Sequence, residues 1–142
     1  MDTVKQEMFE QAKAQGLEAG IVPVSNPPDE EQRLEELERL GLVEKDFESD
    51  RRFNNVTQIA SYLTECPVSV INILSNDSQF CKLSSGVDAE TKERLKQTPR
   101  DTSICQYVLA TPGEQLIIED IDVKPFQIDR MLNHLAQAGK LD

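Results

Sequence analysis

Hydrophobic residues recur along the chain with two periods, and the longer period predicts amphipathic helices. Leucines spaced by three and four predict a helix over 29–42, which Asp29 can cap and which Gly41 would end. A second helix is predicted over 53–63, where Phe, Val, Ile, Ala and Leu share one side, and Pro67 follows soon after it.

The shorter period predicts strands. Residues 68–74 are a run of Val, Ile and Leu, short enough and β-branched enough to be a strand buried on both faces. Asn76 and Asp77 supply a turn, and alternation over 79–85 predicts a second strand that pairs with the first in a hairpin. A third short strand is predicted over 115–119.

The remaining segments are interpreted as helices and loops. They comprise a short amphipathic helix over 2–16, a linker rich in Pro and Gly over 17–28, an exposed loop or short helix over 88–96, and helices that begin near Ser103 and at Pro125. This order predicts an α/β (α+β) fold. We expect an N-terminal helix and linker over 1–25, followed by one domain over 26–142.

The net negative charge of the chain argues against partners that are themselves strongly negative. The 142 residues carry a formal charge of −11, whereas nucleic acids and acidic membranes are bound through an excess of Lys and Arg. We therefore expect no nucleic-acid partner. Much of the acidic excess lies between residues 29 and 48, where crowded glutamates such as Glu30 and Glu31 predict a solvated helix face.

Three cysteines, Cys66, Cys81 and Cys105, lack the paired short spacing of metal sites and redox motifs. Free buried thiols in a reducing compartment fit this pattern best. The N-terminus is acidic where a secretory signal would be basic, and no apolar run approaches the roughly 20 residues of a membrane span. We expect a cytoplasmic protein without membrane insertion.

The segment 99–105 carries the most chemistry. Ser103 with Gln106 has the form of a capping box, and Arg100 adds a positive charge beside the unpaired N–H groups of the predicted helix start. Such a place attracts phosphate or carboxylate. Alternatively, Asp101 or Ser103 itself satisfies those donors, and the two interpretations can coexist.

Two further groups of residues could carry chemistry. Cys105 would lie in the first helical turn, where the helix dipole favours a thiolate. The single histidine, His134, lies off the apolar stripe of its predicted helix, so we interpret it as solvent-exposed in preference to a base for Cys105. Glu119, Asp120 and Asp122 could bind a cation, although an acidic strand exit facing water fits them better. Because the chain has no glycine-rich phosphate loop, HExxH or G-x-S-x-G motif, we expect no catalytic residue, no metal site and no enzymatic activity.

Several segments together resemble the opening two thirds of a GAF domain, of the type found in bacterial sensor histidine kinases and diguanylate cyclases. The similarity covers about residues 26–126, and its most specific part is the P-R-x-x-S-x-C pattern formed by Pro99, Arg100, Ser103 and Cys105. The matching segments are PPDEEQRLEELERLGL, RFNNVTQIASYL, CPVSVINILSNDSQFCKLSSG, TPRDTSICQYVL and QLIIEDIDVKPF.

The resemblance implies a six-stranded antiparallel sheet with helices against it. It also implies a pocket for a cyclic nucleotide, a bilin, a haem or another small ligand, or an empty pocket, so no cofactor is assigned. The residues that the resemblance places around the pocket are Phe80, Lys82, Arg100, Ser103, Cys105 and Asp120. We expect a sensory or regulatory module that passes its signal through flanking helices, with a homodimer or a signalling domain as partner. The alternative is a dimerisation domain without ligand.

The C-terminal part departs from the family pattern. Residues 124–126 stand where the family reads D-x-R-F, and the chain stops at Asp142, before two strands that lie inside the family's sheet. Without them the edge of the strand over 68–74 would carry unpaired backbone groups and exposed apolar surface. We expect a longer protein, a second chain that completes the sheet, or a reorganised sheet.

Overall fold

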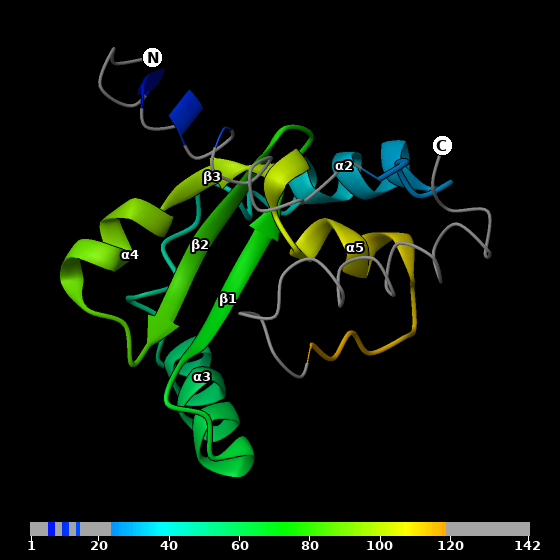
Figure 1. Cartoon of the computed structure of the whole chain (residues 1–142). Helices are drawn as coiled ribbons and strands as arrows, with labels where there is room; N and C mark the ends of the chain where they lie inside the picture. The colour runs from blue at the N-terminus through cyan, green and yellow to red at the C-terminus, as the bar shows by residue number, and fades with distance from the viewer. Residues whose placement is uncertain (1–5, 8–9, 12–13, 15–23, 119–142) are drawn as a thin grey trace. The chain divides into compact units, whose positions relative to one another are not determined.

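The computed structural model describes residues 6–7, 10–11, 14 and 24–118. Its elements are the helices α2 (Glu30–Arg39), α3 (Arg51–Thr64), α4 (Ala89–Leu95) and α5 (Cys105–Ala110), the strands β1 (Ser69–Leu74), β2 (Ser78–Ser85) and β3 (Gln97–Pro99), and the 3-10 turn η1 (Arg100–Thr102) (Figure 1). The mixed α+β class is therefore confirmed. The chain divides into two compact units, one of residues 32–98 and one of residues 1–31 with 99–142.

The sheet of the described residues has three strands in the order β1-β2-β3. β1 and β2 are antiparallel, from Ser69 opposite Ser85 to Leu74 opposite Gln79, so the predicted hairpin is confirmed. Ser75 N donates to the Ser78 carbonyl at 2.8 Å and closes the turn. β1 is an edge strand among the described residues, and it has no charged residue to discourage pairing with another strand.

β2 contains a β-bulge that interrupts its alternation. Ile71 lies opposite Leu83 and Asn72 lies opposite Cys81, so Lys82 is an extra residue in the ladder. A bulge bends its strand and turns the extra side chain in a new direction. The strict alternation predicted over 79–85 is therefore wrong at this one position.

Gly86 follows β2 at a place where only glycine fits. Its φ is +75°, and a Cβ built on it would lie 1.8 Å from the backbone carbonyl oxygen of Pro67. This contact joins the end of the hairpin to the segment that leads into β1. The absent side chain is therefore what lets the two backbones approach.

The boundaries of α3 follow from its end residues. Asp50 is the N-cap, and its Oδ1 accepts from Arg52 N at 3.0 Å. Glu65 ends the helix in the left-handed region with φ +55°. α3 packs against β1 and β2 through a side that includes Thr57, which is 2% exposed.

Most of the predicted apolar stripe of α3 lies outside the core. Phe53 stacks on the buried Phe47, with ring centroids 4.2 Å apart. Val56, Ile59 and Leu63 are 55%, 56% and 73% exposed. The apolar side of the predicted helix is therefore largely exposed, whereas the polar Thr57 of the same helix is buried.

α2 ends at Arg39, earlier than the predicted Leu42, because Gly41 takes the left-handed conformation with φ +60°. Arg33 of this helix donates to the Leu74 carbonyl at 2.7 Å, so its side chain satisfies the last backbone acceptor of β1. Over 88–96 the structure has the short helix α4, one of the two predicted alternatives, and Asp88 caps it by accepting from Thr91 N at 2.9 Å.

The other unit has a small core around α5. Tyr107 is 1% exposed and packs with Ala110, and the half-buried Leu116 packs against this pair. The predicted strand over 115–119 is absent from 115–118, since Ile117 is 71% exposed and no described strand pairs with the segment. Leu116 is held by packing and not by a ladder.

Several predictions lie outside the described residues. These are most of the helix over 2–16, the linker up to residue 23, and Glu119, Asp120, Asp122, residues 124–126, the helix from Pro125 and His134.

Candidate functional site

The first group of predicted site residues is built around a buried ion pair. Arg100 is 6% exposed, and its Nη1 lies 2.5 Å from Glu30 Oε1. Its Nη2 also donates to Asn26 Oδ1 at 3.2 Å. The expectation that Glu30 lies on a solvated face is wrong, since it is 8% exposed. A buried guanidinium needs a carboxylate partner, and Glu30 provides it.

Ser103 satisfies part of the start of α5. Its Oγ accepts from Cys105 N at 3.1 Å, and its own N donates to the Arg100 carbonyl at 2.9 Å. The interpretation that Ser103 itself satisfies these donors is therefore confirmed. Helix α5 has only six residues, which leaves it a weak dipole.

The reciprocal bond of the predicted capping box is replaced by other contacts of Gln106. This side chain is 2% exposed, and its Nε2 donates to the Asp101 carbonyl at 2.8 Å. Its Oε1 accepts from Val24 N at 3.1 Å. Gln106 therefore connects the chain before α2 with the start of α5, a role that the sequence pattern did not reveal.

The three thiols are free and differ in exposure. Cys66 is exposed, whereas Cys81 and Cys105 are half-buried. Burial raises the pKa of the Cys81 thiol, whose Sγ donates to the Leu83 carbonyl at 3.8 Å. The expectation of free cysteines is confirmed, whereas the expectation that they are buried is wrong for the exposed Cys66. The raised pKa of Cys81 lowers the fraction of its thiol that is a nucleophilic thiolate.

The second group of predicted site residues lies on β2. The bulge residue Lys82 donates from Nζ to the Val43 carbonyl at 2.7 Å, and the ammonium lies 5.8 Å from the ring centroid of Phe47. Phe80 is half-buried and lies opposite Ile73 in the ladder. Lys82 therefore supports the loop after α2 as well as being a candidate for ligand contact.

The six predicted pocket residues fall into three places. Arg100, Ser103 and Cys105 follow one another in one unit, Phe80 and Lys82 belong to the other unit, and Asp120 lies outside the described residues. The pocket that the resemblance implies stays a prediction.

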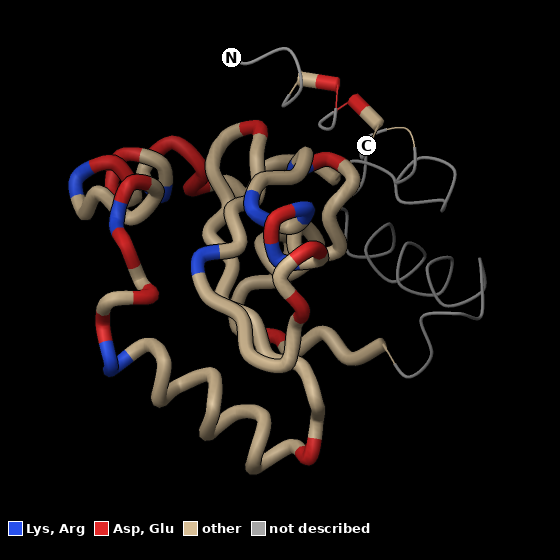
Figure 2. Tube along the Cα trace, turned by 90° about the vertical axis from the view of Figure 1, so that its left-hand side faces the viewer, with Lys and Arg blue, Asp and Glu red and all other residues tan. Residues whose placement is uncertain are grey.

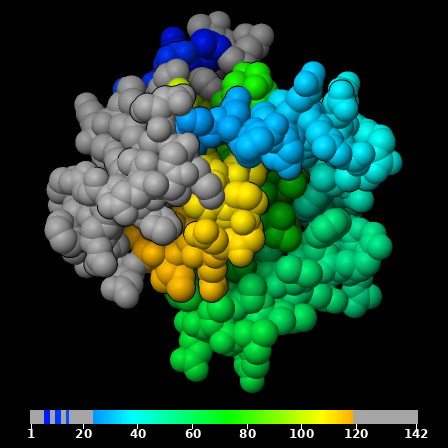
Figure 3. Space-filling view, turned by 90° about the vertical axis from the view of Figure 1, so that its right-hand side faces the viewer, coloured from blue at the N-terminus to red at the C-terminus, as the bar shows by residue number. Residues whose placement is uncertain are grey.

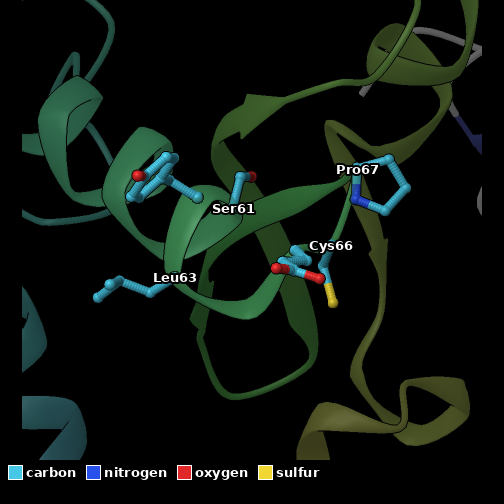
Figure 4. A pocket seen from close by; sticks show the side chains of 6 residues that line it. Ser61, Leu63, Cys66 and Pro67 are labelled. Atoms are coloured by element: carbon cyan, nitrogen blue, oxygen red, sulfur yellow. The ribbon is translucent and has the colours of Figure 1, made fainter.

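A shallow depression of about 550 Å³ lies at the C-terminal end of α3 (Figure 4). Ser61 Oγ is buried there without a hydrogen-bond partner in the structure, and the lining also includes the exposed Cys66. The lining residues are Ser61, Tyr62, Leu63, Glu65, Cys66 and Pro67. Within the described part of the chain, no three His, Cys, Asp or Glu side chains gather in a way that could hold a metal ion.

Comparison with known proteins gives two partial similarities. A cyclic di-GMP phosphodiesterase of Pseudomonas aeruginosa is 31% identical over 87 residues, which is 61% of this chain and 14% of that protein. A probable murein peptide carboxypeptidase of Bacillus subtilis is 57% identical over 35 residues, which is 25% of this chain and 11% of that enzyme. The matched segments span only a small part of either relative.

No protein-family model and no solved structure matches the chain. The similarity to the phosphodiesterase indicates a signalling context. None of the helices in the described ranges is both long and apolar enough to cross a bilayer.

Proposed function

We propose that this chain is a GAF-like sensory or regulatory module of a signalling protein, which binds a small molecule or relays a signal through its flanking helices. The observation that carries this proposal is the 31% identity over 61% of the chain with part of a cyclic di-GMP phosphodiesterase. The P-R-x-x-S-x-C pattern at Pro99, Arg100, Ser103 and Cys105 supports it.

A regulatory role fits the extent of the similarity better than a catalytic one. The matched segment is 14% of the phosphodiesterase, so the activity in that protein's name can reside in the rest of it. The 35 residues shared with the carboxypeptidase are fewer than a domain needs to bury a core of its own. We therefore propose no enzymatic activity for this chain.

The environment of Lys82 supports a ligand contact on β2. An ammonium carries three N–H donors, and the Val43 carbonyl takes one of them at 2.7 Å. The bulge at this position resembles those that turn side chains toward binding sites. Lys82 is therefore the residue of β2 that we propose for contact with a polar ligand.

Mass spectrometry of the purified chain tests the proposal. We expect the mass under native conditions to exceed the denatured mass by that of a released small molecule, and Lys82→Gln to reduce the occupied fraction. Lys96→Gln is the control, since Lys96 is exposed and pairs with the nearby Glu93 at 3.5 Å. Equal native and denatured masses in every preparation would argue against a bound ligand.

The second candidate is a dimerisation domain without ligand. The exposed apolar side of α3 favours it, because Val56, Ile59 and Leu63 are each more than half exposed.

A further inference from the structure

Exposed apolar side chains gather on α3 and the segment that follows it. Among the described residues, six of the nine exposed large hydrophobic side chains belong to 56–70. These six are Val56, Ile59, Tyr62, Leu63, Val68 and Val70. Scattered single hydrophobics are normal on a protein surface, whereas a cluster of this kind marks an interaction site.

Four of these residues form one continuous surface of the helix. Val56, Ile59 and Leu63 recur at i, i+3 and i+7, and Tyr62, 83% exposed, lies beside them. We call these four residues the α3 face. Figure 3 shows the segment that contains α3 on the surface at the lower right.

Charge is confined to the two ends of this helix. Between Phe53 and Asn76 the sequence carries a single charged residue, Glu65, in a chain that is 29% charged. The other end begins with Arg51 and Arg52, and Figure 2 shows the long uncharged stretch between the basic and acidic ends. Both arginines are exposed, and Arg52 is paired with Asp50 at 2.6 Å, so Arg51 is the cation of the first turn that we consider for a contact with a partner.

We propose that the α3 face binds the α3 face of a second copy of this chain, with the two helices antiparallel across a two-fold axis. The midpoint between Arg51 and Glu65 is residue 58, so Ile59 would lie beside its own copy near the axis. Each Arg51 would meet the partner's Glu65, and the helix dipoles would oppose one another. The helix is about 21 Å long, which keeps both end contacts within one interface.

The depression at the end of α3 fits the same arrangement. It is lined by Glu65 and Tyr62, and it lies where the first turn of an antiparallel copy would arrive. The side chain of Arg51 from the second copy would then enter the depression beside Glu65. The antiparallel arrangement therefore brings the two apolar faces together, pairs the opposite charges and fills the depression.

A second copy fits the α3 face better than other partners do. The overall charge of −11 repels a copy, but the face itself is uncharged and its ends attract their counterparts. An anionic membrane would need a cluster of Lys and Arg around the apolar residues. Between Lys45 and Lys82 the sequence has two basic residues, Arg51 and Arg52, which are too few for such a cluster.

Sedimentation velocity of the full chain at about 10 to 200 µM tests the proposal, which rests on the second candidate function. We expect a concentration-dependent dimer that Ile59→Asp converts to monomer. Leu40→Asp, which adds the same charge at a residue 51% exposed after α2, should remain dimeric. A wild-type chain that is monomeric throughout would overturn both the interface and the second candidate.

Exchanging the charges of Arg51 and Glu65 tests the proposed interface separately from the dimerisation function. Arg51→Glu and Glu65→Arg should each weaken the dimer by about tenfold, and the double variant should restore it. Both substitutions suit the dipole of α3, so neither weakens the helix in the monomer, which circular dichroism verifies. A dimer that the exchange leaves unaffected, or does not restore, would place the interface elsewhere while the dimerisation function stands.

Discussion

Charged side chains are buried around Arg100, whereas apolar side chains are exposed on the outer side of α3. Around Arg100 the chain buries a charged pair, with Glu30 and Arg100 at 8% and 6% exposure. On α3 it exposes aliphatic side chains, with Leu63 at 73%. A buried charge needs a compensating partner, which Arg100 has within the same chain, whereas a large exposed apolar surface marks a place where another molecule can bind.

The difference shows which region is complete by itself. Arg100 finds Glu30 and Asn26, and Gln106 finds the Asp101 carbonyl and Val24 N, all within one unit. These contacts hold the segment before α2 against the start of α5. The α3 face consists of apolar residues typical of a core, but they are exposed to solvent. A bound partner would therefore change the burial of this region.

Breaking the buried pair should have the largest effect on stability. Arg100→Ala leaves Glu30 buried without its cation, and we expect a loss of about 3–5 kcal/mol in the free energy of unfolding. Urea titration followed by circular dichroism measures it. Arg94→Ala, at an exposed arginine of α4, is the control and should change little.

The double variant Glu30→Leu with Arg100→Met sharpens this test. Replacing both members of a buried pair by apolar groups of similar size is often neutral, so the double variant should recover most of the loss. If it is no more stable than Arg100→Ala, the pair is not what sets the stability of this region.

A Leu→Ala substitution should lower the free energy of unfolding much more at a buried position than on the α3 face. Leu83 is 3% exposed on β2, and Leu83→Ala should cost about 2–4 kcal/mol through lost burial and a cavity. Leu63→Ala on the α3 face should change the stability of the monomer by less than about 0.5 kcal/mol. Thermal unfolding at low protein concentration measures both, and comparable costs would show that Leu63 belongs to a core.

The hairpin and the helices α2 and α3 could be predicted from the sequence because they depend on local patterns, whereas β3 was not predicted and the strand over 115–119 was predicted wrongly. Each of these elements is determined by residues close together in the sequence: the strands by β-branched residues, the turn by residues 76–77, and α3 by the spacing of its apolar residues. The partner of Arg100 could not be predicted, since Glu30 is 70 positions away and stands in a run of glutamates that looks uniformly solvated.

The bulge and the orientation of α3 were also beyond the sequence. A strand pattern does not show where one extra residue will enter a ladder, as Lys82 does. The helix pattern identified an apolar side, but a helix contacts its sheet through whichever side fits. Here Thr57 lies on that side, and Ile59 does not. The six ligand residues inferred from the resemblance stay predictions for the same reason, because their placement depends on tertiary structure.

Adding a side chain at Gly86, at the end of the hairpin, should have an intermediate effect on the free energy of unfolding. Gly86→Ala brings a methyl group within 1.8 Å of the Pro67 carbonyl oxygen at a φ of +75°, and we expect a loss of about 2–3 kcal/mol. Gly41→Ala is the matched control, since its φ is +60° and no atom lies within 4 Å of the added group. It should lose only about 1 kcal/mol, from backbone strain alone. Equal losses would mean that the contact with Pro67 is unimportant.

Acidification should have the smallest effect, and it acts on the end of α3 that carries Arg51. The side chain and backbone N–H of Arg52 lower the pKa of Asp50 from 3.8 to about 2. Because the pKa is lower in the folded chain, this contribution is present above about pH 4 and is lost as the pH falls toward 2. Asp50→Asn keeps an N-cap that does not titrate, so its stability should vary less between pH 4 and pH 2 than that of the wild type. Thermal unfolding across this range measures the difference. Parallel curves for the two proteins would show that Asp50 does not stabilise the start of α3 through its charge, and the ion pair with Arg52 would then be a surface contact without consequence for the helix.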